Sequence, residues 1–230
     1  LNMQSPYDRE NITSILTECV SRSDLRESYV KMILTRGSPP PGSRDPRDCE
    51  NRFYALAIPY VWIADEEKQA EGLHMSVGTV PQISPESVDP TVKNFHWGDM
   101  LKGLFEAYDR GAETVVLTDG NGNITEGPGF NLFANISGRL VTPESGVLLG
   151  ITRMTVIELA ELLNVKVEVG TLTERELRSA DEVFVSSTAG GVMPVSRLDG
   201  DPIGDGAPGP LTQRLRQMYW DAHDDDKYVT

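Results

Sequence analysis

The sequence predicts a mixed α/β protein, of the α+β kind, with a small first domain and a larger second one. Short segments rich in β-branched and aromatic residues alternate with segments in which apolar residues recur every three or four positions. Two of the short segments are joined by a tight turn, so the pattern differs from the regular strand and helix alternation of a doubly wound parallel sheet. The 230 residues suit one large domain or two modest ones.

The first predicted element is a helix, followed by two strands. Ser5-Pro6 has the pattern of a helix N-cap with proline in the first turn, and apolar residues at i, i+3, i+4 and i+7 form one face over 12–19. Strands are predicted at 28–35 and 53–62, where β-branched and aromatic residues gather. The proline-rich segment 37–47 is predicted to be the loop between them.

A polar and charged segment divides the predicted domains. Residues 63–73 are expected to be a linker between the remainder of a small N-terminal domain at 1–62 and a large domain at 74–230. Because the first helix cap lies almost at the first residue, we expect the small domain to be incomplete and a segment upstream to be missing.

The second domain is predicted to alternate helices with short strands. Apolar spacing and caps predict helices at 98–110, 151–163 and 211–222, and the capping box at 173–176 predicts the start of a further, short helix. Strands are predicted at 114–118, 165–169 and 181–187, with a β-hairpin formed by 129–136 and 139–142 around Ser137-Gly138.

Composition excludes several classes of partner. The formal net charge of -14 argues against nucleic acid, because neutralising phosphates requires clustered Lys and Arg, and against an anionic membrane surface. No apolar run approaches the roughly 20 residues that span a bilayer. Cys19 and Cys49 lack metal-ligand spacing, and we expect them to be unpaired in a reducing, cytoplasmic compartment, with no metal bound.

The segment 89–99 (DPTVKNFHWGD) places Lys93 among apolar and aromatic residues, just before a predicted helix. A lysine in a low-dielectric site loses its charge more easily, and only the neutral amine attacks a carbonyl. The alternative is a lysine whose stem packs while its head reaches water. His96 is expected to be packed, and Asp99 is expected to cap the helix.

Three further segments place polar or small residues at the ends of predicted elements. The run 148–153 (LLGITR) opens a helix, whose free amides suit a phosphate and where Thr152 adds a hydroxyl. The run 186–191 (SSTAGG) follows a buried strand and leaves room for a phosphate or carboxylate. Glu126 stands among glycines before an apolar strand, where it can pair with a protonated ring nitrogen. Taken singly, the three segments are more commonly an ordinary Thr-capped helix, a strand-to-loop turn and a solvated turn glutamate, respectively.

Together, a lysine, a carboxylate, a helix-end anion site and a strand-end threonine are the parts that pyridoxal 5′-phosphate (PLP) requires. With the motifs DPTVKNFHWGD, LTDGNGNITEGPGFN, GVLLGITR and SSTAGGVMP, the chain resembles the fold-type IV PLP-dependent aminotransferases. This class holds branched-chain and D-amino-acid aminotransferases, and the chain resembles most closely the fungal (R)-selective amine transaminases. The resemblance extends to Trp220 and implies the two-domain fold-type IV architecture.

The resemblance also implies a role for each residue of the site. Lys93 would form the Schiff base with the cofactor and shuttle the proton, and Glu126 would pair with the pyridine nitrogen. The other cofactor-binding residues would be Leu148 against the ring, and Ile151, Thr152 and Thr188 at the phosphate. The substrate residues would be Trp97, Tyr60, Arg44 and Ala189.

The chain departs from the family pattern in three ways. Gly98 stands where branched-chain enzymes carry a tyrosine five residues after the lysine, which weakens the branched-chain interpretation. The phosphate-binding arginine and pocket aromatics of the small domain would lie upstream of Leu1. The arginine that receives the keto-acid carboxylate in (R)-amine transaminases aligns with Gly42, and Arg44, two residues away, is a candidate substitute.

These observations favour a transaminase that moves an amino group from a primary amine or amino acid to a keto acid, of the (R)-amine:pyruvate type. The alternatives are a branched-chain or D-amino-acid aminotransferase, and a truncated, weakly active or inactive paralogue that keeps the fold. The partners implied by the resemblance are small-molecule amines and keto acids and a second copy of the chain in a homodimer, with no nucleic acid and no membrane.

Overall fold

A computed structural model describes residues 1–228. The chain divides into two compact units, Leu1–Trp62 and Ile63–Thr230. The segment 63–73, predicted to be a linker, belongs to the second unit, where it carries helix α2 (Glu66–Glu71) and the first residue of strand β3.

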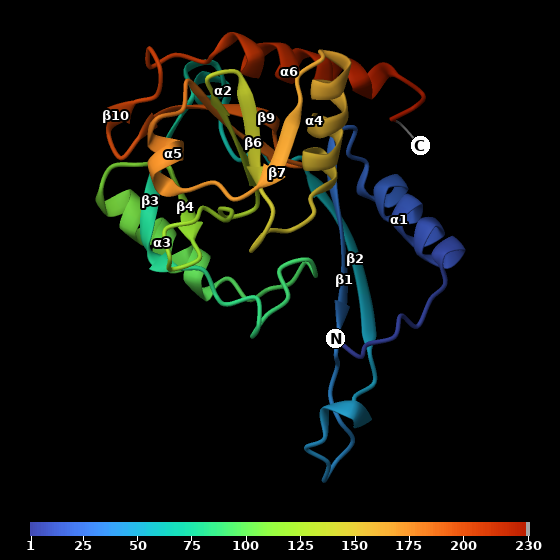
Figure 1. The fold of residues 1–230 in the computed structure, drawn as a ribbon. Coiled ribbons are helices and arrows are strands. Elements are labelled where there is room, and N and C mark those ends of the chain that lie inside the picture. Colours follow the sequence, from blue (N-terminus) through green and yellow to red (C-terminus); the bar gives the residue numbers. More distant parts are fainter. Residues whose placement is uncertain (229–230) are drawn as a thin grey trace. The chain divides into compact units, whose positions relative to one another are not determined.

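The first unit consists of a helix and a β-hairpin (Figure 1). Helix α1 spans Arg9–Ser23, and strands β1 (Ser28–Thr35) and β2 (Arg52–Pro59) pair antiparallel from Ser28↔Pro59 to Thr35↔Arg52. The prediction of β1 is confirmed, and β2 ends at Pro59, three residues before the predicted end at 62.

The predicted cap of α1 at Ser5 is wrong. Asp8 is the N-cap, and its Oδ1 accepts a hydrogen bond from the amide of Asn11 at 2.8 Å. A carboxylate at the positive end of a helix is favourable, and this one satisfies an amide that has no partner within the helix. The loop between β1 and β2 contains a short 3₁₀ helix, η1 (Pro46–Asp48).

The second unit combines strands with further helices that follow α2. The helices are α3 (Gly98–Asp109), α4 (Ile151–Leu162), α5 (Glu174–Arg178) and α6 (Pro210–Asp221), with the 3₁₀ helix η2 (Ala222–Asp224) after α6. The strands are β3 (Leu73–Pro81), β4 (Thr114–Thr118), β5 (Asn131–Ile136), β6 (Arg139–Pro143), β7 (Val167–Gly170), β8 (Glu182–Ser187), β9 (Gly191–Leu198) and β10 (Asp201–Pro202).

The strands form one mixed sheet in the order β4-β3-β9-β8-β5-β6-β7, with β10 paired to β9. The pairs β3–β4, β3–β9 and β6–β7 are parallel, and the pairs β5–β6, β5–β8 and β8–β9 are antiparallel. Antiparallel hairpins within a partly parallel sheet are what the predicted α+β class requires, so the predicted fold class is confirmed.

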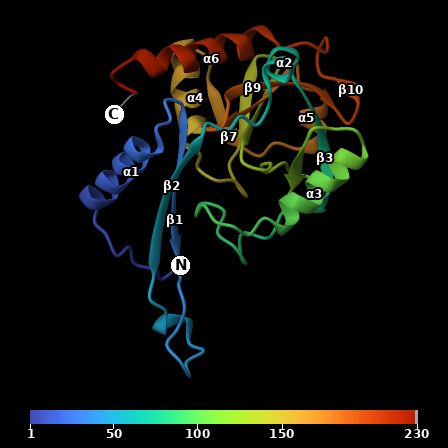
Figure 2. The ribbon, with the colours of Figure 1, turned by 180° about the vertical axis from the view of Figure 1, so that it is seen from behind.

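Alternating residues of the strands divide the core into two main layers. Phe133 and Phe184, whose rings stack with centroids 4.9 Å apart, face α4 and α6, which lie side by side in Figures 1 and 2. Their strand neighbours Leu132 and Val185 face the opposite way, toward a second cluster completed by α5. Helix α3 packs on β3 and β4 over a third, smaller cluster (Figure 2).

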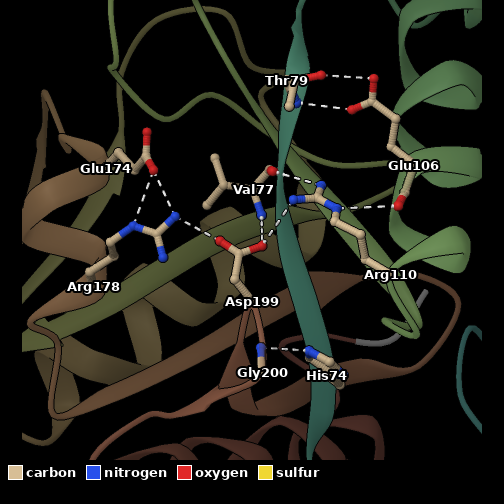
Figure 3. A network of polar contacts seen from close by, with 9 residues as sticks. All are labelled: His74, Val77, Thr79, Glu106, Arg110, Glu174, Arg178, Asp199 and Gly200. Atoms are coloured by element: carbon tan, nitrogen blue, oxygen red, sulfur yellow. Dashed lines mark hydrogen bonds and ion pairs between the residues drawn. The ribbon is translucent and has the colours of Figure 1, made fainter.

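Asp199 joins several elements of the second unit through its carboxylate (Figure 3). Oδ1 accepts from the amide of Val77 at 3.2 Å and from Arg110 at 3.4 Å, and Oδ2 accepts from Arg178 at 2.7 Å. Asp199 and Gly200 both have positive φ, at 51° and 91°, and connect β9 to β10. This is the two-residue Asp-Gly turn that matches the twist of a hairpin.

Two further findings concern the composition-based predictions. Cys19 and Cys49 are both free, as predicted. Within residues 1–228, no helix combines the length and the apolar character that crossing a membrane requires.

Candidate active site

The predicted cofactor-binding residues of the second unit gather where β5 begins and β6 and β8 end. Glu126 precedes β5, Leu148 lies between β6 and α4, and Thr188 directly follows β8. Because β5 is antiparallel to both neighbours, its first residue, Asn131, pairs with Ser186 near the end of β8. Three segments distant in sequence therefore meet at one edge of the sheet.

Glu126 is held by one of its two carboxylate oxygens. Oε2 accepts hydrogen bonds from the Leu148 amide at 2.8 Å and from Nδ2 of Asn131 at 3.1 Å, whereas Oε1 accepts none from the described residues. Burial raises the pKa of Glu126 from 4.5 to about 7, and the Leu148 amide and the charges of Lys93 and Arg153 oppose that shift. One oxygen is thus left to accept a hydrogen bond from a cationic N–H group.

The N-terminus of α4 provides an anion site. Gly150 is the N-cap and supplies no side-chain oxygen, so the first amides of the helix have no side-chain partner. Ile151 is exposed, whereas Thr152 is a buried residue whose hydroxyl has no hydrogen-bond partner within residues 1–228. Amides, helix dipole and hydroxyl together suit a phosphate.

The end of β8 lies against the same edge of the sheet. The Ser187 hydroxyl donates to the carbonyl of Gly129 at 2.8 Å, and the exposed Thr188 follows it. The amide of Ala189, a predicted substrate contact, donates to Ser187 Oγ at 3.2 Å. It would have to leave this partner in order to bind a substrate carboxylate.

Lys93 lies in a loop and is exposed, so the expectation of a lysine buried by apolar neighbours is wrong. The aromatic residues around it do not enclose it, because Phe95 is 70% and Trp97 46% exposed. Its charge nevertheless acts on Glu126 and lowers the pKa of that carboxyl. A Cβ built on Gly129 would lie 3.7 Å from Cη2 of Trp97, so Trp97 also reaches the start of β5.

Two other predictions about this segment are wrong. His96 is exposed and not packed. Trp97, and not Asp99, is the N-cap of α3; Asp99 lies one residue inside the helix and accepts a bond from the amide of Ile83 at 2.6 Å. The carboxylate thus anchors the segment that leaves β3 to the first turn of α3.

Two predicted substrate residues belong to the first unit. Arg44 is exposed in the loop between β1 and β2, just before η1. Tyr60 follows β2, is half-buried, and makes an edge-to-face contact with Trp62 at a centroid distance of 4.9 Å.

Two residues of the site were missed by the sequence analysis, Asn131 and Arg153. Both are buried, and Arg153 ties α4 to the end of β6 by donating to Thr142 Oγ1 at 3.1 Å and to the Pro143 carbonyl at 2.9 Å. The sequence signal that could have found them is the position of each residue on the apolar face of its strand or helix. Asn131 shares its strand face with Phe133, and Arg153 lies three residues before Val156 on the apolar face of α4, so both polar groups need partners inside.

The arrangement therefore offers three chemical functions close to one another. A primary amine lies within electrostatic reach of a carboxylate that keeps one oxygen available. Beside them, uncapped helix amides and a threonine hydroxyl suit an anion. A small molecule that carries a basic ring nitrogen, a carbonyl and a phosphate would use all three.

Comparison with known proteins agrees with this chemistry. The family described as amino-transferase class IV matches residues 1–198. The branched-chain-amino-acid aminotransferases of Pseudomonas aeruginosa and Escherichia coli (strain K12) are each 30% identical to the chain, over 225 residues (96% of this chain, 72% of the relative) and 219 residues (92% and 70%). The crystal structure of a branched-chain amino acid aminotransferase from T.th. with pyridoxamine 5′-phosphate matches 98% of this chain and 75% of that one, with a TM-score of 0.89 at 29% identity. The chain therefore belongs to the class IV aminotransferase family and is a PLP-dependent aminotransferase.

Proposed function

We propose that this aminotransferase acts on branched-chain L-amino acids and transfers their amino group to a 2-oxo acid. The observation that carries the proposal is the name of its relatives. The similar proteins of Pseudomonas aeruginosa and Escherichia coli are called branched-chain-amino-acid aminotransferases, and the similarity extends over at least 92% of this chain. This replaces the (R)-amine:pyruvate type as the leading interpretation.

The residues of the site divide the work of binding and proton transfer. Bound PLP supplies an electron-accepting ring, which stabilises the negative charge that develops at the substrate Cα. Lys93 would hold the cofactor through Nζ and carry the proton removed from Cα. Glu126, through its available Oε1, would accept a hydrogen bond from the ring nitrogen and keep that nitrogen protonated.

The remaining cofactor contacts would come from α4 and β8. The amides of Ile151 and Thr152, with the Thr152 hydroxyl, would bind the phosphate, and Thr188 would add a further bond. Leu148 would pack against the ring, because it is half-buried and its backbone is fixed by Glu126. The lack of a side-chain cap on α4 supports this assignment.

A second candidate function is (R)-selective amine transamination, with pyruvate as acceptor. The observation that favours it is Trp97 followed by Gly98, in place of the tyrosine expected in branched-chain enzymes. Trp97 and Tyr60 would then shape the substrate pocket, Arg44 would receive the keto-acid carboxylate, and Ala189 would contact the substrate. We also propose a homodimer, which light scattering of the purified chain would test.

A donor panel separates these functions. The purified protein, loaded with PLP, would be mixed with L-leucine, L-valine, D-alanine or (R)-1-phenylethylamine, and bleaching of the cofactor's visible band would be followed. Faster bleaching by L-leucine and L-valine is the result expected. Faster bleaching by (R)-1-phenylethylamine would support the second candidate, and faster bleaching by D-alanine a D-amino-acid enzyme. A visible band that none of them bleaches would support the inactive paralogue.

A further inference from the structure

Asn131 is a buried polar residue at the start of a central strand. It is the first residue of β5, where it pairs with Ser186 of β8, and it is only 5% exposed. Its side chain lies on the face of the sheet that carries Phe133, toward α4. A primary amide buried at such a position requires partners for both of its hydrogens.

Both amide hydrogens of Asn131 are used within the site. Nδ2 donates to Glu126 Oε2 at 3.1 Å and to the Leu148 carbonyl at 2.8 Å. The Leu148 amide donates to the same Glu126 oxygen at 2.8 Å. The three residues therefore form a closed triangle of hydrogen bonds. The amide has only one workable orientation, because its oxygen, if turned around, would face two acceptors.

The other end of the Asn131 amide determines how α4 begins. A Cβ added to Gly150 would lie 2.3 Å from Asn131 Oδ1, so the amide occupies the space that any side chain at position 150 would need. The Gly150 amide donates to the Leu148 carbonyl at 2.8 Å, the same oxygen that Asn131 binds. The position of the Asn131 side chain thus fixes the turn that leads into the helix.

We propose that Asn131 is a positioning residue, which holds the Glu126 carboxylate and the first turn of α4 in one arrangement. The contact to the cofactor's ring nitrogen and the contact to its phosphate are then set together by one side chain. The inference rests on the proposed roles of Glu126 and of the α4 N-terminus. It differs from a purely structural role, because it predicts which parts of the cofactor lose affinity when Asn131 is changed.

The test compares three ligands on cofactor-free protein: PLP, its 1-deaza analogue with carbon in place of the ring nitrogen, and pyridoxal, which lacks the phosphate. Affinities would be measured by quenching of tryptophan fluorescence for the wild type, Asn131→Ala and Asn135→Ala. Asn135 is the matched control, an asparagine four residues further along β5 on the same face, bonded at the far end of the strand.

Asn131→Ala is expected to weaken PLP binding roughly 10- to 100-fold, the loss typical of a hydrogen bond to a charged group. The same variant should weaken the deaza analogue and pyridoxal much less, because each already lacks one of the two contacts. Asn135→Ala should bind all three ligands as the wild type does. Equal losses for the three ligands, or unchanged PLP affinity, would overturn the proposal. A loss confined to the ring nitrogen, with an unchanged preference for PLP over pyridoxal, would also overturn it, because the two contacts would then be independent.

Two further variants distinguish the role of Asn131 from the role of Glu126 and from a failure to fold. Glu126→Ala, measured with PLP and the deaza analogue, tests the carboxylate by itself. If this variant still prefers PLP over the deaza analogue as strongly as the wild type does, the proposed role of Glu126 is disproved, and not that of Asn131. If Asn131→Ala does not fold by near-ultraviolet circular dichroism, Asn131→Ser retains a donor at the position. It should then show an intermediate loss for PLP, and a loss equal for all three ligands would again overturn the proposal.

Discussion

Changing Glu126 to glutamine in the cofactor-free protein is expected to alter how stability depends on pH. The pKa of this carboxyl rises from 4.5 to about 7 on folding, because burial disfavours its charged form. Between these two values the unfolded chain has released the proton while the folded protein still holds it. The slope of the unfolding free energy with pH is then negative, so this group makes the protein less stable as pH rises.

The size of the effect follows from the shift. A rise from 4.5 to about 7 corresponds to roughly 3 kcal/mol, at about 1.36 kcal/mol for each pKa unit. The loss of stability is absent below pH 4.5, where both states hold the proton, and complete above pH 7. Glutamine carries no titrating proton, so Glu126→Gln should gain roughly 3 kcal/mol relative to the wild type across that window.

Urea unfolding of both cofactor-free proteins at a series of pH values between 4 and 8.5 would measure this difference. Glu144→Gln is the matched control, because Glu144 is an exposed glutamate between β6 and α4. A difference between Glu126→Gln and the wild type that stays constant with pH would refute the reasoning. Loading with PLP should reverse the order, because a protonated ring nitrogen then stabilises the charged carboxylate of the wild type alone.

Three further predictions concern other residues. Lys93→Ala should lower the transamination rate about 10²- to 10⁴-fold, the range for losing a proton-transfer group. Added methylamine should restore part of the rate, and full activity in the variant would exclude Lys93 as the proton carrier. Gly150→Ala should destabilise the protein by about 1–3 kcal/mol in urea unfolding, because its Cβ would lie 2.3 Å from Asn131 Oδ1. Gly98→Ala, whose Cβ would meet nothing within 4 Å, is the control, and equal effects of the two changes would contradict this reasoning. Asp199→Ala should cost about 1–3 kcal/mol, because the Val77 amide loses the Asp199 acceptor and Arg178 keeps, among the described residues, only Glu174 as an acceptor. Asp199→Asn should cost less, because asparagine tolerates the positive φ and still accepts from Val77. Identical melting temperatures for both variants would disprove this ranking.

Local sequence predicted those elements whose own composition determines their conformation. The hairpin around Ser137-Gly138, where both residues have positive φ, and the capping box of α5 are set by neighbouring residues and are confirmed. Strands β3 and β9 were missed because glycine, serine and proline interrupt their apolar pattern. They pair in parallel with each other, Leu73 opposite Val195, and no local signal reports a partner so distant in sequence.

The residues of the site likewise divide into those that local sequence predicted and those that it missed. The α4 N-terminus and the position of Glu126 before β5 follow from adjacent glycines and polar residues. The contact of Asn131 with both of them depends on how β5 and the segment after β6 are brought together, which the pattern alone does not specify. The exposure of Lys93 was missed for a related reason, since apolar neighbours in sequence bury a lysine only when they fold over it.

The triangle of Glu126, Asn131 and Leu148 also has a consequence for the order in which the site assembles during folding. Its hydrogen bonds join residues 5, 17 and 22 positions apart, whereas the bond from Ser187 to Gly129 spans 58. Loop-closure entropy grows with the length of the loop, so the triangle is cheaper to close than the contact with β8. The parts of the site proposed to hold the ring nitrogen and the phosphate therefore form a unit that is local in sequence, and closing it costs less loop entropy than joining it to β8.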